Sequence, residues 1–442
     1  MSTDSMLLGN AFDGDARHLL DPVEQDLVRR RMHTFGNAVP LFYGQPLNPT
    51  RAEGVWLFDH LDRPYLDAYN NVPCVGHCHP RVVKAIAEQA ARLNTHTRYL
   101  SEVVSSYAER LLAEFEPSLS RVLFTSSGTE SVDLALRIAR YHTGAEGIIV
   151  TRFAYHGHSA AVAEITPAFG AGVPIGRDVR TVAVDAGLSA GGVSAGDFAD
   201  AVAQAIDDLR RHGVGLAALI VDTSLSSDGL FVDPAGFLRP AVELAQRAGG
   251  LFIADEVQPG FGRLGHGMWG YSRHGVSPDL VVLGKPMGNG MPIAAVVSKP
   301  ELLASFAART GYFNTFGGNT VCCAAAAAVL NVIKEEGLIE HAALVGQHLR
   351  AGLGRLQRQT ARIAGVRGAG LYAAVEIVGG EDGTAPDRVE ALRLVNGLRA
   401  RRILISTCGA AGNVLKIRPP LPFSAEHADL LTTTLEELLL QR

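Results

Sequence analysis

Short, continuous apolar runs alternate with amphipathic helical patterns between about residue 80 and residue 320, and this alternation restricts the fold more than any other feature of the sequence. Continuous apolar runs are typical of strands that are covered on both faces, whereas a strand with one solvated face alternates apolar and polar residues. Strands that alternate with helices predict an α/β fold, in which helices wrap a mostly parallel sheet. The expected strands are 122–125, 148–151, 216–221, 251–254, 280–283 and 293–297, and the expected helices among them include 82–93, 130–141 and 240–248.

The two flanking parts of the chain differ from this central region. Residues 1–79 and 321–442 combine short extended pieces with longer helical patterns, which cover 338–356, 388–401 and 425–440. We therefore expect residues 80–320 to form a large domain. We expect residues 1–79 to form an N-terminal segment and part of a smaller α+β domain, which residues 321–442 complete.

Charge and hydropathy argue against two classes of protein. The chain has 40 Lys and Arg residues against 45 Asp and Glu residues, a net charge of −5, whereas nucleic-acid-binding proteins normally carry a basic excess. The longest apolar run, residues 321–330, covers about half of the ~20 residues that a membrane span requires. The first residues are acidic where a secretory signal is basic, and the cysteines lie mostly in apolar stretches, so we expect free thiols and a cytoplasmic protein.

The segment from Cys74 to His79 contains two cysteines and two histidines, and it invites comparison with metal sites. Its spacing matches no common zinc pattern, and no second pair of ligands follows at a suitable distance. We therefore expect no metal site.

Polar residues follow five of the expected strands at the point where each strand ends. Ligands bind outside the carboxyl ends of the strands in open α/β sheets. Because the carboxyl ends of parallel strands meet at one edge of the sheet, we expect these residues to lie close together in an active site. In chain order they are Ser127, Gly128, Thr129, Tyr155, Asp222, Asp255, Gln258 and Lys285.

The segment from Ser127 to Glu130 opens an expected helix and allows two interpretations. It fits a capping box, in which Ser127 and Glu130 satisfy the first backbone donors of the helix. It also fits an anion site, because free N–H groups, a glycine and two hydroxyls can hold a phosphate at the positive end of the helix dipole. No Walker phosphate loop occurs in the chain.

Lys285 and Asp255 each follow a buried strand, and each has a structural and a chemical interpretation. A lysine at a strand end is commonly exposed, but one held in a desolvated cleft has a lowered pKa and can form a Schiff base with an aldehyde. A carboxylate directly after a buried strand needs a cationic partner, because a lone buried charge is costly.

A phosphate-binding helix start, a Schiff-base lysine and a buried aspartate are the parts that a pyridoxal phosphate site needs. Together with the strings 253–258, 260–263 and 278–279, they make the chain resemble the class III (fold type I) aminotransferase family from about residue 30 to the C-terminus. The resemblance implies a pyridoxal 5′-phosphate enzyme in which Lys285 holds the cofactor aldehyde and Asp255 pairs with the ring nitrogen.

The same resemblance implies roles for the other residues of the site. Gln258 would bond the ring 3′-oxygen and Tyr155 would stack on the ring. The cofactor phosphate would be bound by Ser127, Gly128 and Thr129, joined by Thr315 from a second subunit, so a homodimer with active sites at the interface is expected. Asp222 stands where the family usually has a glutamate, one methylene longer, and is expected among the cofactor-binding residues.

One departure from the family concerns the substrate. Lys416 occupies the position at which family members often have an arginine that grips a substrate carboxylate, and a lysine is the poorer carboxylate clamp. We expect a second cationic pocket, formed by Lys416, Arg98 and Arg418, that binds a substrate phosphate. For Arg418, the alternative of a solvated strand residue stays open.

The strings 71–80, 97–100, 154–158, 284–290 and 413–417 narrow the resemblance to the ethanolamine-phosphate phospho-lyase branch, which lies close to the alanine–glyoxylate aminotransferase 2 branch. This implies a lyase that eliminates phosphate from O-phosphoethanolamine or a similar phosphorylated amino alcohol. A transaminase that moves an amino group between an amine or amino acid and a keto acid would use the same residues. A third alternative is a non-catalytic regulator with this fold.

Overall fold

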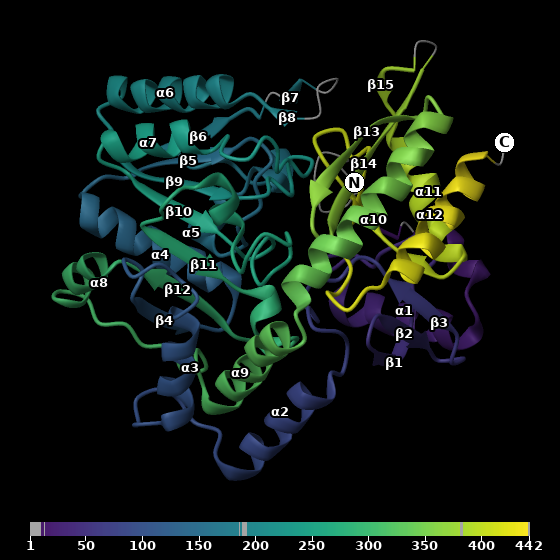
Figure 1. Ribbon diagram of the computed structural model, residues 1–442, viewed down its shortest axis with the longest axis horizontal. Coiled ribbons are helices and arrows are strands. Elements are labelled where there is room, and N and C mark those ends of the chain that lie inside the picture. Colours follow the sequence, from purple (N-terminus) through teal and green to yellow (C-terminus); the bar gives the residue numbers. More distant parts are fainter. Residues whose placement is uncertain (1–9, 13, 185, 188–191, 381–382, 441–442) are drawn as a thin grey trace.

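The computed structural model describes residues 10–12, 14–184, 186–187, 192–380 and 383–440. Its largest element is a seven-stranded sheet in the order β4-β12-β11-β10-β9-β5-β6 (Figure 1). Neighbouring strands pair in parallel except where β12 pairs antiparallel with both β11 and β4. The strands are β4 (Arg121–Thr125), β5 (Gly147–Thr151), β6 (Val179–Val182), β9 (Leu216–Asp222), β10 (Leu251–Asp255), β11 (Leu280–Leu283) and β12 (Ala294–Ser298). The prediction of a mostly parallel α/β sheet is therefore confirmed.

Both faces of this sheet are buried, and alternate residues of each strand face opposite sides. Phe252 and Ala254 of β10 belong to the apolar cluster that includes α6 (Ala195–Arg211) and α7 (Arg239–Arg247). Leu251 and Ile253 belong to the cluster that includes α4 (Gly128–Thr143). Burial on two sides explains why these strands are continuous apolar runs in the sequence.

Two smaller sheets and three long helices form the other side of the molecule, at the right of Figure 1. The four-stranded sheet joins the two ends of the chain, because β3 (Pro64–Asp67) pairs in parallel with β16 (Ile403–Leu404). Its other strands are β1 (Pro49–Glu53) and β2 (Trp56–Asp59), and the five-stranded sheet contains β13 (Ile363–Ala369), β14 (Tyr372–Gly379), β15 (Ala385–Pro386), β17 (Ser406–Cys408) and β18 (Val414–Ile417). The helices are α10 (Leu338–Gln359), α11 (Arg388–Ala400) and α12 (Ala425–Leu440). The expected domain boundaries stay a prediction.

The remaining elements are shorter or lie between these parts. They are α1 (Pro22–Phe35), α2 (Pro80–Arg92), α3 (Glu102–Leu112), α5 (Ala160–Ala163), α8 (Pro300–Ala307), α9 (Thr320–Glu335), the hairpin strands β7 (Ala186–Gly187) and β8 (Gly192–Val193), and the 3₁₀ helices η2 (Asp15–Leu19), η3 (Pro167–Gly172), η4 (Gly270–His274) and η5 (Lys285–Gly288). Within the described ranges, no helix combines the length and the apolar character that crossing a bilayer demands.

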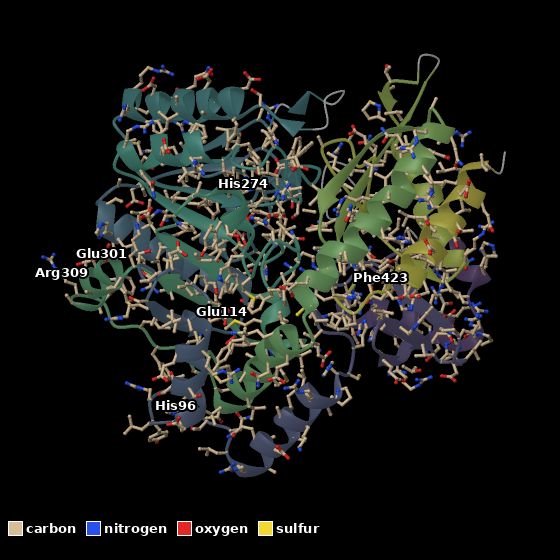
Figure 2. All side chains as sticks on the ribbon, viewed as in Figure 1. His96, Glu114, His274, Glu301, Arg309 and Phe423 are labelled. Atoms are coloured by element: carbon tan, nitrogen blue, oxygen red, sulfur yellow. The ribbon has the colours of Figure 1, made fainter. Side chains whose placement is uncertain are left out.

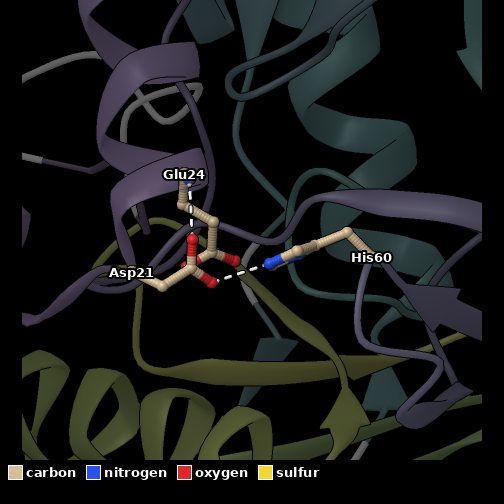
Figure 3. A group of neighbouring side chains, drawn as sticks. All are labelled: Asp21, Glu24 and His60. Carbon is tan, nitrogen blue, oxygen red and sulfur yellow. Dashed lines mark hydrogen bonds and ion pairs between the residues drawn. The ribbon is translucent and has the colours of Figure 1, made fainter.

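A capped helix fixes the N-terminal part of the chain to the four-stranded sheet. Asp21 precedes α1 and accepts hydrogen bonds from the backbone N–H groups of Val23 and Glu24, both at 2.9 Å. The same carboxylate pairs with His60 Nε2 at 2.7 Å, in the turn after β2 (Figure 3). A side-chain cap of this kind satisfies the otherwise unpaired donors of the first helical turn.

Candidate active site

The carboxyl ends of β5, β10 and β11 meet residues of the five-stranded sheet around a cavity of about 290 Å³. Tyr155, Gln258 and Lys285 line it from the side of the large sheet. Lys416 of β18 and Arg418 line it from the other side. Residues from distant parts of the sequence therefore converge, as the pattern of strand ends predicts.

Lys285 begins η5, directly after the end of β11. Its side chain is exposed to the open cavity that it lines, and the protein around the cavity still desolvates the amine. Burial lowers the pKa of the Lys285 amine to about 8, the nearby cations Arg418 and Lys416 act in the same direction, and Asp255 opposes them. A desolvated lysine with a lowered pKa is a better nucleophile and proton acceptor at neutral pH than an exposed one.

Asp255, the last residue of β10, is buried and has two polar contacts. Its Oδ2 lies 2.6 Å from His156 Nδ1, and its Oδ1 accepts a hydrogen bond from the backbone N–H of Val257 at 3.0 Å. The His156 ring is also buried, and its Nε2 has no hydrogen-bond partner among the described residues. Sequence reasoning missed this histidine, and the only signal was its place beside Tyr155 after a buried strand.

Gln258 joins the two sides of the cavity through its amide. Its Nε2 donates to Ser226 Oγ at 2.6 Å, and its Oε1 accepts a hydrogen bond from the Tyr372 hydroxyl at 3.1 Å and another from the Arg418 guanidinium. An amide with three fixed partners has a defined orientation toward the cavity.

Asp222, at the end of β9, is not among the residues that line the cavity. Its Oδ1 accepts hydrogen bonds from the backbone N–H and the hydroxyl of Ser224, at 3.0 and 2.7 Å. Its Oδ2 accepts from Ser226, whose hydroxyl in turn receives the Gln258 amide. The observed contacts connect Asp222 to the site through Ser226 and Gln258, and direct cofactor binding by Asp222 stays a prediction.

The start of α4 has the serine cap of the predicted capping box, but Glu130 bonds Ser126 and not the cap residue Ser127. Ser127 Oγ accepts a hydrogen bond from the backbone N–H of Glu130 at 3.2 Å, and Glu130 Oε2 accepts from the backbone N–H of Ser126 at 2.8 Å. Backbone also approaches this helix start closely, because a Cβ atom on Gly157 would lie 2.5 Å from Thr129 Oγ1. The capping role of Ser127 is thus confirmed, that of Glu130 is not, and the hydroxyls and the helix dipole at the same place suit a phosphate.

The residues of the site fit pyridoxal 5′-phosphate chemically. The start of α4 offers donors for its phosphate, Lys285 offers an amine for its aldehyde, and Asp255 offers a carboxylate for its ring nitrogen. Tyr155, half-buried in the cavity wall, offers an aromatic face.

Lys416 and Arg418 are buried cations on the wall opposite the strand ends. Lys416 is 8% exposed and its Nζ donates to the Ser226 carbonyl oxygen at 3.4 Å, while Arg418 is 6% exposed and its Nε donates to the Tyr69 carbonyl oxygen at 3.2 Å. The alternative of a solvated strand residue is therefore wrong for Arg418. No Asp or Glu lines the cavity in the described part of the chain, so three cations face it without a lining carboxylate.

Arg98 and Thr315 are not among the residues that line this cavity, and neither are Ser127, Gly128, Thr129, Asp222 and Asp255. The Arg98 guanidinium is exposed and lies over the Phe313 ring, 4.7 Å from its centre. Thr315 is exposed in the neighbouring loop, where Asn314 Nδ2 donates to Glu130 Oε2 at 2.8 Å, beside the start of α4. A single chain does not bring either residue to the cavity, and their binding roles stay predictions.

Comparison with known proteins identifies the family. The sequence profile described as aminotransferase class-III matches residues 42–439. An alanine–glyoxylate aminotransferase 2-like protein of Drosophila melanogaster is 39% identical over 419 residues, 91% of this chain and 85% of the relative. An ethanolamine-phosphate phospho-lyase homolog 1 of Caenorhabditis elegans is 35% identical over 437 residues, 94% of this chain and 93% of the relative.

A solved structure is similar over nearly the whole chain. A phospholyase from Arthrobacter, in complex with phosphoethanolamine, superposes with a TM-score of 0.91 at 42% sequence identity and covers 94% of this chain and 100% of its own. The fold type I architecture that the resemblance implies is thereby confirmed. The profile match, the two relatives and the structure lead to one conclusion: the chain belongs to the class III aminotransferase family.

Proposed function

We propose that the protein is a pyridoxal 5′-phosphate-dependent lyase that eliminates phosphate from O-phosphoethanolamine or a similar phosphorylated amino alcohol. The products are an aldehyde, ammonia and phosphate. The observation that carries the proposal is the cavity beside Lys285, where Lys416 and Arg418 add two buried cations and none of the described lining residues is acidic. A dianion is the ligand that such a cavity stabilises most, because charge-assisted hydrogen bonds are about twice as strong as neutral ones. The phospholyase and phospho-lyase relatives support the same substrate class.

The chain's own residues divide the work of this reaction. Pyridoxal 5′-phosphate, the cofactor of the family, supplies an aldehyde that bonds to amines and a ring that withdraws electrons. Lys285 Nζ removes a proton from the substrate carbon that bears nitrogen, and its lowered pKa makes the neutral amine available for this step. Phosphate leaves from the neighbouring carbon with the electron pair of the C–O bond, held by Lys416 and Arg418. Water then releases ammonia and the aldehyde.

Transamination is the alternative that the same residues allow, and the alanine–glyoxylate aminotransferase 2-like relative gives it specific support. Both reactions require Lys285 to remove the same proton, so they differ only in the later steps. A transaminase needs a keto acid to complete its cycle, whereas the lyase does not. A non-catalytic role is disfavoured, because Lys285 and Gln258 line the cavity and Asp255 is held by His156 at the end of β10.

We further propose a homodimer with an active site at each side of the interface, and a cytoplasmic location. The exposed aromatic surface formed by residues 96–100 and 313–316 supports the dimer, since it adjoins the start of α4 through Asn314. The five cysteines, all of them within the described ranges, are free, which agrees with a reducing compartment.

The deciding experiment measures phosphate release from O-phosphoethanolamine with and without an added keto acid. We expect equal rates in both cases and stoichiometric ammonia and acetaldehyde. Lys416→Met should lower kcat/KM about 10- to 200-fold, because it removes one charge-assisted contact to the substrate. Lys84→Met, a change at an exposed lysine on α2, is the matched control and should have no effect. Amine transfer that depends on the keto acid, without phosphate release, would establish the transaminase alternative.

A further inference from the structure

A buried side-chain donor without a partner lies in the cavity wall, far in sequence from the residues considered so far. Asn10 lines the same cavity of about 290 Å³ as Lys416 and Arg418. The residue is only 7% exposed, and its Nδ2 has no hydrogen-bond partner among the described residues. Buried polar groups are nearly always paired, because an unpaired one costs free energy, so an unpaired donor in a cavity wall indicates a ligand that accepts its hydrogen bond.

The backbone around Asn10 is fixed by pairing with the segment that follows α1. The Asn10 carbonyl oxygen accepts a hydrogen bond from the backbone N–H of Tyr43 at 2.7 Å, and Phe12 N–H donates to the Leu41 carbonyl oxygen at 2.8 Å. Ala11 and Phe42 form an antiparallel bridge between these bonds. Backbone hydrogen bonds therefore hold Asn10 in the wall of the cavity.

The same segment is tied to the next part of the cavity wall. The Tyr43 hydroxyl donates to the Ile405 carbonyl oxygen at 3.1 Å, and Ser406, the next residue, also lines the cavity. Phe42, which lines the cavity beside Asn10, packs edge-on against Tyr69 at 5.7 Å, and the Arg418 guanidinium lies 5.3 Å from the centre of the Tyr69 ring. These contacts fix Asn10 in place relative to Arg418.

The chemistry of an amide N–H selects one part of the substrate. In a phosphorylated amine the acceptors are the phosphate oxygens, whereas the amino group would bond to the cofactor aldehyde in place of Lys285. Lys416 and Arg418 supply charge to the phosphate, and a neutral amide adds a directional donor without adding charge. We propose that Asn10 is a substrate-binding residue that donates a hydrogen bond through Nδ2 to the phosphate of the substrate. This inference rests on the proposed phospho-lyase function and extends it to the N-terminal segment.

The test compares Asn10→Asp and Asn10→Ala with the wild-type holoenzyme. Asn10→Asp keeps the shape but replaces the donor by a negative charge, so kcat/KM for O-phosphoethanolamine should fall about 100-fold or more, and inorganic phosphate should lose its ability to inhibit. Asn10→Ala removes the donor alone, and we expect about a 10-fold loss, mostly in KM. Asn37→Asp, the same change at an exposed position of the N-terminal region, is the control and should behave as wild type.

Two further readouts separate a binding role from a general loss of structure. The visible absorbance of the bound cofactor, and its change on adding ethanolamine, should be the same in all variants, because ethanolamine carries no phosphate. Thermal melting should show that each variant is folded. Equal losses with both amines, or unchanged phosphate release by Asn10→Asp, would overturn the role of Asn10. Failure of the wild type to release phosphate would instead overturn the proposed function, and the Asn10 inference with it.

Discussion

The Lys285 side chain is exposed to the cavity, and the protein around it favours the neutral form of the amine. Burial is the main cause of the lowered pKa, and Arg418 and Lys416 contribute in the same direction. The two cations that would hold a substrate phosphate therefore also help to prepare the lysine that removes the substrate proton. Asp255 limits the effect, because a nearby carboxylate stabilises the ammonium form.

This arrangement predicts a pH dependence for proton removal. We expect kcat for phosphate release to rise as the pH increases through about 8 and then to level off, because only the unprotonated Lys285 amine accepts a proton. Single-turnover phosphate release, followed from neutral to alkaline pH, measures this rise in rate. A rise centred near pH 10.5, the ordinary pKa of lysine, would show that the cavity does not lower the pKa of Lys285.

His156 is the residue through which Asp255 is held in position, and it has a measurable consequence. His156→Phe removes the 2.6 Å contact to Asp255 and leaves that carboxylate with a single backbone donor. We expect kcat to fall about 10- to 100-fold with little change in KM, because a charge-assisted hydrogen bond is lost away from the substrate. The absorbance of the bound cofactor should shift as well, and His156→Gln, which can still donate, should recover part of the activity. Unchanged spectra with a lower kcat would contradict the positioning role.

Sequence reasoning located the residues whose chemistry is uncommon at a strand end and missed those whose chemistry is ordinary. A lysine before a glycine turn and an aspartate after an apolar strand have few structural explanations, so Lys285 and Asp255 could be selected from the sequence. A histidine beside a strand has many, so the place of His156 beside Tyr155 gave no decisive signal. Asn10 gave none either, because its place in the cavity depends on a short bridge to Phe42.

Among the elements, the start of α4 shows how three strand ends build the predicted phosphate site. Gly128, at the first position of α4, has room only for a small residue, because a Cβ atom there would lie 3.2 Å from Val257 Cγ2. Gly284, after β11, packs its backbone against that of Gly128. A Cβ atom added at Gly284 would lie 3.2 Å from the Gly128 Cα atom. The close approach of these segments leaves the hydroxyls of Ser127 and Thr129 beside the helix dipole.

Gly157 allows a test of this arrangement. Its φ of 144° lies in a region that side chains rarely adopt, and an added Cβ atom would lie 2.5 Å from Thr129 Oγ1. Gly157→Ala should therefore displace Thr129, weaken cofactor binding about 10-fold or more, and lower the free energy of unfolding by about 1–3 kcal/mol. Equilibrium dialysis of pyridoxal 5′-phosphate and thermal melting measure the two effects. Gly172→Ala is the control that should leave both unchanged, because no atom of the described residues packs within 4 Å of an added Cβ there.

Most strands of the large sheet could be predicted because burial on both faces leaves a continuous apolar run. All six expected strands are present within a residue or two of their predicted limits, and β12 is the one that runs against the others. The strand that was missed, β6, lies at the edge of the sheet and carries Arg180 and Thr181 between its two buried valines. An edge strand with polar residues does not produce a continuous apolar run, so its sequence resembles a loop.

On the scale of the whole molecule, the cavity depends on contacts between parts of the chain that are far apart in sequence. The parallel pair of β3 and β16 joins residues 66–67 to 403–404, and the hydroxyl of Tyr43 bonds Ile405. These contacts bring the N-terminal segment, β17 and β18 together opposite the strand ends. The hydrophobic pattern within one segment does not specify the distant strand with which that segment pairs. The sequence pattern therefore predicted that the two ends of the chain share a smaller domain, but not the register in which their strands pair.

The exposed surface of residues 96–100 and 313–316 gives the prediction that concerns the assembly. His96, at the lower edge of the molecule in Figure 2, stacks on Tyr99 at 5.0 Å and meets Phe313 edge-on at 5.9 Å. Tyr99, Leu100 and Phe316 are 67%, 106% and 68% exposed, and exposed apolar side chains that gather in one region often mark an interface.

We expect the protein to be a dimer of the 46.9 kDa chain in which this surface is buried, because Thr315 and Arg98, both predicted to serve an active site, lie in it and not at the cavity of their own chain. Leu100→Glu combined with Phe316→Glu should yield monomers, since burying two carboxylates in an apolar interface is costly. These monomers should bind pyridoxal 5′-phosphate weakly, because each lacks the Thr315 of a partner. Light scattering and cofactor titration measure the two effects.

Leu344→Glu, at an exposed leucine of α10, is the control that should stay dimeric. A double variant that is monomeric and still retains full cofactor affinity would show that each chain completes its own site.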